Sequence, residues 1–256
     1  ISKDQQERLL QKKWKNVLGG LAKERFVILN PKFIPKETRR WMFQQVKSNE
    51  LIQTLKLTLA PAYGLIPASL PGALEKTDTE FLYRETALPN LEKLSFDLEL
   101  ADSDEIDAQI VTHLLKVWRH PSLNIHIKAY PTDQYIERVV ESKSAAVIAK
   151  KDIDYPDGYS VLGYFDSGNE SALFHASSPE IDEALQKSSR EFDEKKRIQI
   201  YKEIQKMILS HFTLIPIGFG ANTSGLWSDR LRYIPPHPMG FHTIPLEMIE
   251  VAGDPE

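Results

Sequence analysis

The chain of 256 residues contains no cysteine, which excludes disulfide bonds, thiolate nucleophiles and zinc sites built on cysteine. It also lacks an apolar run long enough to cross a membrane, because three prolines and two glycines interrupt its most apolar stretch, residues 55–74. Neither sign of charge dominates, since 32 lysines and arginines against 36 aspartates and glutamates give a net charge of −4. The chain is therefore not a broadly basic nucleic-acid binder, and we expect no nucleic-acid partner.

Sequence motifs of catalysis and metal binding are absent as well. There is no phosphate-binding loop, no Gly-x-Gly-x-x-Gly and no Gly-x-Ser-x-Gly. The seven histidines form no His-x-x-x-His or Glu-x-x-His pair that would place two ligands on one helix face. The clustered carboxylates Asp152, Asp154 and Asp157 are the only basis for a hydrolase, and they lie too close in one turn to act across a substrate. We expect no enzyme, no metal and no cofactor.

Length and composition predict a globular protein of one large domain or two small ones, since 41% hydrophobic and 27% charged residues are ordinary values for that class. We divide the chain into a body, residues 1–235, and a proline-rich tail, residues 236–256. The body begins with an expected polar helix over residues 1–20. Because the chain starts at Ile1 with a charged, glutamine-rich run and not with Met, we also expect a processed or truncated product.

Short segments with clear signals follow the first helix. The apolar, branched run RFVILN predicts a buried strand over residues 25–30. A helix is expected over residues 35–47, with Pro35 near its start, where a missing N–H is tolerated. The proline-rich residues 60–72 read as an irregular surface loop.

The middle of the chain is the most informative about fold. Alternation and helical spacing predict five elements in the order strand, helix, strand, helix, strand: residues 93–100, 103–117 (capped by Ser103), 123–130, 132–142 and 145–149. Such a β-α-β-α-β unit forms a parallel sheet, and ligands bind beyond the carboxyl ends of its strands. The loop after the last strand, residues 150–169, is therefore the first place to look for a site. Two helices capped by Ser177 or Ser178 and by Asp193 follow, then a strand over residues 214–219.

Several segments, in this order, resemble one family. They are RFVILNPKF, PKETRRWMFQQ, GLIPASLPG, DIDYPDG and the closing series SSPEIDEAL, DEKKRIQIYKEIQKMIL and LIPIGF. Together they resemble the bacterial extracellular solute-binding proteins of family 5, the peptide- and nickel-binding components of ABC importers. The resemblance covers residues 20–235 and only the C-terminal lobe of the family protein. It implies an α/β fold: a periplasmic-binding-protein-like lobe whose mixed sheet contains the parallel β-α-β-α-β unit, flanked by helices.

The resemblance also implies site residues. In peptide-binding members, the aspartate at the position of Asp154 pairs with the free α-amino group of the ligand. The alternative is a turn in which Asp154 and Asp157 accept hydrogen bonds from nearby backbone N–H groups. The sequence departs from the family at Lys151, where a tryptophan is common, and at Gly158, which replaces a second proline. A cation at position 151 favours an anionic or altered ligand, or none. The expected ligand-binding residues are Lys151, Asp154, Tyr155, Asp157 and Tyr159.

Other side chains carry two interpretations each. Tyr164 and Phe165 line an apolar cleft or pack in the core. Arg39 or Arg40 matches the family's helix arginine and serves a ligand carboxylate, or it lies on a solvated or salt-bridged helix face.

The function implied by the resemblance is solute binding, of a peptide first, with closure of two lobes around the ligand. The implied partners are an oligopeptide or other small solute, the N-terminal lobe that has no counterpart here, and an importer permease. We expect a monomer in the periplasm or outside the cell, with or without a membrane anchor. The alternative is the solute-sensing C-terminal domain of a bacterial transcription regulator, which would be cytoplasmic. A single lobe offers one wall of a cleft, so we expect negligible peptide affinity for it alone.

Overall fold

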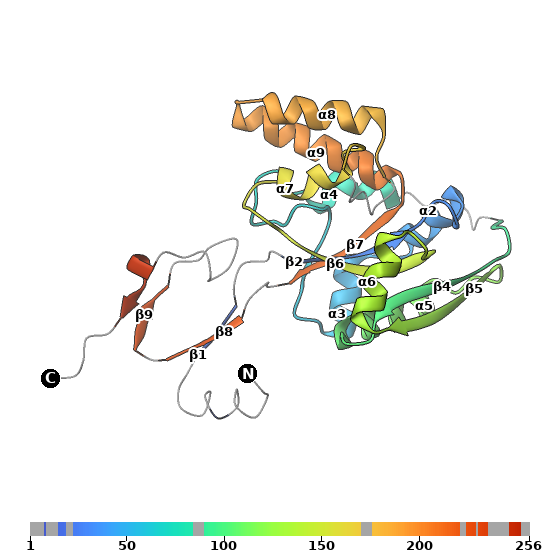
Figure 1. Ribbon diagram of the computed structural model, residues 1–256, viewed down its shortest axis with the longest axis horizontal. Coiled ribbons are helices and arrows are strands. Elements are labelled where there is room, and N and C mark those ends of the chain that lie inside the picture. Colours follow the sequence, from blue (N-terminus) through green and yellow to red (C-terminus); the bar gives the residue numbers. More distant parts are fainter. Residues whose placement is uncertain are drawn as a thin grey trace.

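A six-stranded mixed sheet forms the centre of the computed structural model, which describes residues 8, 15–18, 23–83, 90–169, 176–220, 224–228, 230–234 and 246–251 (Figure 1). The strand order is β3-β7-β2-β6-β4-β5, and two separate ribbons pair β1 with β8 and β9 with β10. The strands are β1 (Lys15–Leu18), β2 (Lys23–Leu29), β3 (Ala60–Pro61), β4 (Leu94–Ala101), β5 (Leu123–Tyr130), β6 (Ala146–Asp152), β7 (Leu214–Gly220), β8 (Ser224–Trp227), β9 (Leu231–Tyr233) and β10 (Glu250–Val251).

Helices cover both faces of this sheet. Figure 1 shows α8 and α9 packed together on one side, with α3 and α5 on the other. The helices are α2 (Lys36–Gln44), α3 (Ser48–Leu55), α4 (Lys76–Thr79), α5 (Glu105–Val117), α6 (Thr132–Val140), α7 (Tyr159–Leu162), α8 (Pro179–Arg190) and α9 (Glu194–Ser210), with the short 3-10 segments η1 (Glu80–Tyr83), η2 (Gly163–Phe165) and η4 (Leu246–Met248). Ser178 and Asp193 cap α8 and α9 with their side chains, as expected.

The predicted parallel unit is confirmed. Strand β4 pairs in parallel with β5 along its whole length and with β6 at Leu98 and Glu99. Strand β2 lies antiparallel between β6 and β7, which makes the sheet mixed. The carboxyl ends of the parallel strands β4, β5 and β6 therefore meet at one edge of the sheet, and the bend after β6 emerges there.

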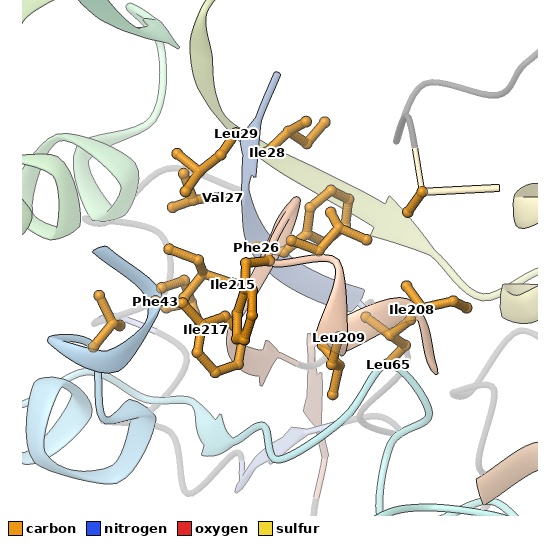
Figure 2. Close-up of a cluster of buried hydrophobic side chains, with 14 of the residues drawn as sticks. Phe26, Val27, Ile28, Leu29, Phe43, Leu65, Ile208, Leu209, Ile215 and Ile217 are labelled. Carbon is orange, nitrogen blue, oxygen red and sulfur yellow. The ribbon is translucent and has the colours of Figure 1, made fainter. Parts of the chain in front are cut away.

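The core is built on the neighbouring strands β2 and β7. Strand β7 is apolar and buried along its whole length, and β2 is apolar from Phe26 to Leu29, because both faces of the sheet are covered there. Figure 2 shows their side chains, among them Phe26, Ile28 and Ile215, meeting residues of α2 and α9 such as Phe43 and Ile208. This rigid centre holds the carboxyl end of β6 in place.

Two expectations for the first third of the chain are wrong. Residues 15–18 form strand β1, paired antiparallel with β8, and not the end of a helix; of the rest of that expected helix only Arg8, which is helical, is described. Residues 60–72 are not a surface loop, since Ala62, Leu65 and Ile66 are each at most 4% exposed. The buried Gln205 of α9 explains why such an irregular segment can lie inside, because it binds the backbone at three points.

Polar side chains with specific partners correct two further expectations. Asp104, and not Ser103, caps α5 by accepting from the N–H groups of Ile106 and Asp107. Glu99, expected on the polar face of its strand, is 2% exposed, and its carboxylate accepts hydrogen bonds from Arg138 and Ser144. A strand face that is buried under α6 accepts a carboxylate only with such partners.

Arg39 is another buried polar residue that the sequence analysis placed elsewhere. It neither lies on a solvated face nor is free to serve a ligand carboxylate. Its guanidinium donates to the carbonyl oxygens of Ile34 at 2.6 Å and of His211 at 3.1 Å, so it joins α2 to the end of α9. Burial lowers the pKa of Arg39.

Helix α6 packs more loosely than its apolar residues predict. Tyr135 and Val139 contact the core, but Ile136 and Val140 are more than half exposed. The helix lies beside β5 at the edge of the sheet, where fewer neighbours are available to cover it. The expected proline-rich tail, residues 236–256, lies largely outside the described residues.

Candidate functional site

The bend that follows β6 carries most of the expected site residues. Strand β6 continues to Asp152, so the bend begins at Ile153, three residues later than expected. The chain then turns tightly: the N–H of Asp157 donates to the carbonyl of Tyr155 at 2.8 Å, and α7 begins at Tyr159. Asp154 and Tyr155 are consequently exposed just beyond the carboxyl end of β6, where a ligand is expected in a sheet of this kind.

An open hollow of about 470 Å³ lies against this bend. Asp154, Tyr155 and Tyr159 line it, and Lys151 and Asp157 do not. Of the two aromatic residues that had two interpretations, Tyr164 lines the hollow and Phe165 is buried in the core. Residues not expected from the sequence also line it: Ser160, Gly163, Asp166, Gly168 and Asn169. Their approach depends on the turn from α7 into η2, and no periodicity in the sequence marks that turn. We call this space, with its nine lining residues, the Asp154 hollow.

Lys151, Asp154 and Tyr164 form a compact polar cluster at the rim of this hollow. The ammonium of Lys151 lies 3.2 and 3.4 Å from the two carboxylate oxygens of Asp154 and 4.2 Å from the centre of the Tyr164 ring. The Tyr164 hydroxyl donates to the same carboxylate at 2.9 Å. Burial alone would lower the pKa of Lys151, but its contacts with Tyr164 and Asp154 raise it. Lys151, three residues before Asp154 in the sequence, therefore forms an ion pair with it.

The contacts of Asp157 are with other residues of the protein, and they stabilise the bend. Its carboxylate accepts from the backbone N–H of Tyr159 at 2.8 Å and from the hydroxyl of Tyr201 at 2.7 Å, and Arg197 of α9 lies 3.8 Å away. These contacts fix the bend to α9. The turn interpretation therefore describes Asp157, whereas the Asp154 carboxylate faces the hollow and accepts from side chains.

Gly158 lets the bend sit directly on the core. A Cβ atom at this position would lie 2.6 Å from Cδ1 of Ile66 and 2.8 Å from Cδ2 of Tyr201. Any larger residue would push the bend away from α9. A glycine is therefore required at position 158, because the bend, the segment of Ile66 and helix α9 approach one another closely there.

Glu24 lies on strand β2 directly opposite Lys151 of β6. Its side chain is buried, at 2% exposure, and its Oε1 has no hydrogen-bond partner. The carboxyl group borders a small cavity of about 10 Å³ that also touches Lys151 and Tyr164. Burial raises the pKa of Glu24 well above its ordinary value of 4.5. The site therefore places the exposed carboxylate of Asp154 close to this buried carboxyl group, and Asp166 is a second carboxylate on the lining of the hollow.

Because the folded protein binds the Glu24 proton more tightly than the unfolded chain, this residue lowers stability as the pH rises above 4.5. We expect Glu24→Gln to stabilise the protein at pH 8 by roughly 1–3 kcal/mol and to have a smaller effect at pH 5. Thermal unfolding at the two pH values measures the difference. The exposed Glu183→Gln is the control and should change the unfolding temperature little at either pH. Equal shifts for Glu24→Gln at both values would contradict burial of an uncharged carboxyl.

A second hollow of about 370 Å³ lies at the start of α3, lined by residues including Lys47, Tyr63, Lys76, Glu80 and Tyr83. Burial and the neighbouring Tyr63 raise the pKa of Tyr83 to about 12. Lysines and glutamates balance around this space, and no residue of the expected site reaches it. The chemistry that the sequence predicts is therefore at the Asp154 hollow.

Within the described ranges, no three His, Asp or Glu side chains converge in a way that would hold a metal ion. In the same part of the chain, no helix has both the length and the apolar surface needed to cross a bilayer.

Comparison with known proteins agrees with the fold. No protein-family model matches the sequence, and no curated protein matches it. Among solved structures, the Escherichia coli murein tripeptide binding protein MppA matches at 14% identity with a TM-score of 0.75. Haemophilus influenzae OppA, solved with the peptide RPPGFSPFR, matches at 15% identity and 0.72, and the dipeptide binding protein of Pseudoalteromonas sp. SM9913, solved with Met-Leu, at 17% and 0.70.

Each of these three matches covers 98% of this chain and 52% of the solved chain. The chain therefore has the fold of one part of the peptide-binding solute-binding proteins, and the expected α/β lobe with a mixed sheet is confirmed. It spans about half of the length of these structures.

Proposed function

We propose that the chain is the solute-binding lobe of an ABC-importer binding protein, and that a peptide or other small solute binds in the Asp154 hollow. The observation that carries the proposal is the position of this hollow: on a fold shared with peptide-binding proteins, it opens beyond the carboxyl end of β6. Three tyrosines and two aspartates line it, which suits a ligand with both apolar and hydrogen-bonding groups.

The remaining parts of the proposal follow from this role. A second lobe would supply the opposite wall of the ligand cleft, and an importer permease would receive the solute. We place the protein in the periplasm or outside the cell, as a monomer. The solved relatives are binding proteins, which agrees with a role without catalysis. No feature of the fold favours the regulator alternative over this one.

Nuclear magnetic resonance tests the proposal, because it detects the weak binding expected of a single wall. A pool of pentapeptides, half with free amino ends and half acetylated, is added to the isotope-labelled chain. We expect backbone amide shifts at Tyr155, Tyr159 and Gly163, with a dissociation constant on the order of 1 mM. Tyr155→Ala should weaken binding about threefold to tenfold, since an exposed aromatic wall is lost.

The matched control is Tyr233→Ala, which removes an exposed tyrosine from β9. It should leave the affinity unchanged. Shifts confined to residues outside the Asp154 hollow, or no shifts at all, would overturn the proposed function. Micromolar affinity would contradict the argument that one lobe supplies only half of the contacts.

A further inference from the structure

The polar cluster at the rim of the Asp154 hollow is already a complete cation site. An ammonium group is held best by a carboxylate and by the face of an aromatic ring. Asp154 supplies the carboxylate and Tyr164 supplies both the ring face and a hydroxyl that orients the carboxylate. The cation in this site is the ammonium of Lys151, which contacts both Asp154 oxygens.

The surroundings of Lys151 keep it there. On β2, Glu24 lies opposite Lys151, and burial raises the pKa of its carboxyl group well above the ordinary value. The other residues of the shared cavity are the apolar Phe26, Leu65, Val161, Phe165 and Leu214. The carboxylate that forms an ion pair with Lys151 is that of Asp154. The two residues are three apart in one chain, so Lys151 competes for Asp154 at a high effective concentration.

The hydroxyl group of Ser160 offers a hydrogen bond to an uncharged ligand in the hollow. Ser160 is 4% exposed and lines the hollow, and its buried hydroxyl has no hydrogen-bond partner. A buried hydroxyl without a partner is destabilising until a ligand satisfies it. A carbonyl or N–H group of an amide fits this requirement without bringing charge.

We propose that Lys151 is the resident cation of the Asp154 hollow, and that the hollow therefore takes a peptide whose amino end is acylated. The acyl amide bonds to Ser160, while Asp154 stays paired with Lys151. A ligand whose free amino end lies at Asp154 is disfavoured, because it must displace Lys151 or place a second positive charge beside it. This proposal rests on the proposed function and adds the class of ligand.

The test compares two probes, Ala-Phe amide and N-acetyl-Ala-Phe amide, by titration of the labelled chain. We expect the wild type to bind the acetylated probe about fivefold more tightly. Lys151→Met keeps the apolar stem and removes the charge, so it frees Asp154. It should strengthen binding of the free-amine probe about fivefold and change the acetylated probe by less than about twofold.

The control Lys187→Met removes an exposed lysine from α8 and should change neither affinity. A wild type that prefers the free amine, or a Lys151→Met variant with an unchanged preference, would overturn the proposal. If neither probe shifts the hollow, the proposed function fails on its own. The pairing of Lys151 with Asp154 is then tested in the free protein, by titrating the Lys151 ammonium. Asp154→Asn should lower the pKa of Lys151, and an unchanged pKa overturns the proposal.

Discussion

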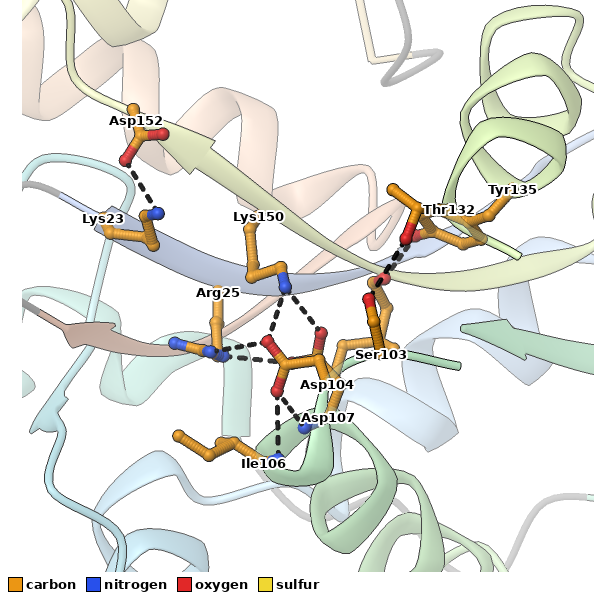
Figure 3. Close-up of polar contacts among 11 residues, drawn as sticks. Lys23, Arg25, Ser103, Asp104, Ile106, Asp107, Thr132, Tyr135, Lys150 and Asp152 are labelled. Carbon is orange, nitrogen blue, oxygen red and sulfur yellow. Dashed lines mark hydrogen bonds and ion pairs between the residues drawn. The ribbon is translucent and has the colours of Figure 1, made fainter. Parts of the chain in front are cut away.

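Arg25→Met should lower the free energy of unfolding by about 3–5 kcal/mol at pH 7, one of the two largest losses expected for a single substitution in this chain. Arg25 lies on β2, and Figure 3 shows its guanidinium in contact with Asp104 and Asp107. The nitrogen–oxygen distance is 3.0 Å in both ion pairs. The Asp107 side chain is 2% exposed. Removing the arginine leaves a buried carboxylate with Lys150 alone, 3.4 Å away.

The pH dependence of this loss follows from the pKa values of the two aspartates. Burial raises the pKa of Asp107, whereas at Asp104 the Lys150 hydrogen bond, the Asp107 N–H and the charge of Arg25 overcome burial and lower the pKa to about 2. Without Arg25, the Asp107 pKa rises further, so the folded state gains more from protonation. The deficit should therefore shrink as the pH falls from 7 towards 5.

Urea unfolding of matched variants measures this prediction. Lys128→Met removes an ion pair with Asp97 in which the lysine side chain is 52% exposed, and it should lower the free energy of unfolding far less than Arg25→Met does. Combining Arg25→Met with Asp107→Asn should recover part of the loss, because the buried charge is gone. A loss below about 1 kcal/mol for Arg25→Met would show that the cluster is solvated.

Gln205→Leu should have a comparable effect, at least about 3 kcal/mol. The side chain of Gln205 is 0% exposed; its oxygen accepts from the N–H groups of Leu65 and Ile66 at 2.9 and 3.1 Å, and its nitrogen donates to the carbonyl of Gly72 at 2.8 Å. Leucine has similar volume but leaves three buried backbone groups without partners, at roughly 1–3 kcal/mol each.

Hydrogen exchange separates a local from a global effect of this substitution. The amides of Leu65 and Ile66 should lose protection in Gln205→Leu even where the sheet remains protected. Gln199→Leu is the control: Gln199 lies on the exposed face of the same helix, bonded to Glu203, and should change stability by less than about 0.5 kcal/mol. Unchanged protection of Leu65 would contradict the assigned role of Gln205.

Local patterns in the sequence were sufficient for the parallel unit. The alternation of Phe96, Leu98 and Leu100 and the helical spacing of Ile110 and Leu114 each depend on neighbours within a few residues. The order strand, helix, strand, helix, strand then predicts parallel strands, because crossover connections of this kind join parallel strands of one sheet. The position of β4 between β5 and β6 comes from the structure.

Buried polar residues were missed because their partners are distant in sequence. Gln205 lies 140 residues from Leu65, and Arg39 lies 172 from His211. A glutamine or arginine on a helix reads as solvent-exposed until the backbone groups it satisfies are known. The burial of residues 60–72 follows from Gln205 and was missed with it.

The site was predictable to the same extent. The spacing of three between Lys151 and Asp154 placed them in contact, and position after β6 placed Asp154 at the edge of the sheet. The contribution of Tyr164, ten residues beyond Asp154, and of Ser160 depends on how α7 turns into η2. Charge and spacing in the sequence therefore indicate the contact between Lys151 and Asp154. The residues that surround this pair could be identified only from the three-dimensional structure.

The paired course of β2 and β7 has a mechanical consequence. These neighbouring strands end side by side, with Lys23 opposite Gly220, and the same two stretches of chain meet again where β1 pairs with β8. The chain thus passes twice between the sheet and the ribbon, and strand pairing holds the two passages together at both ends, at Lys23 and Gly220 and at Leu18 and Ser224. Two passages joined in this way cannot separate at either end without the loss of backbone hydrogen bonds.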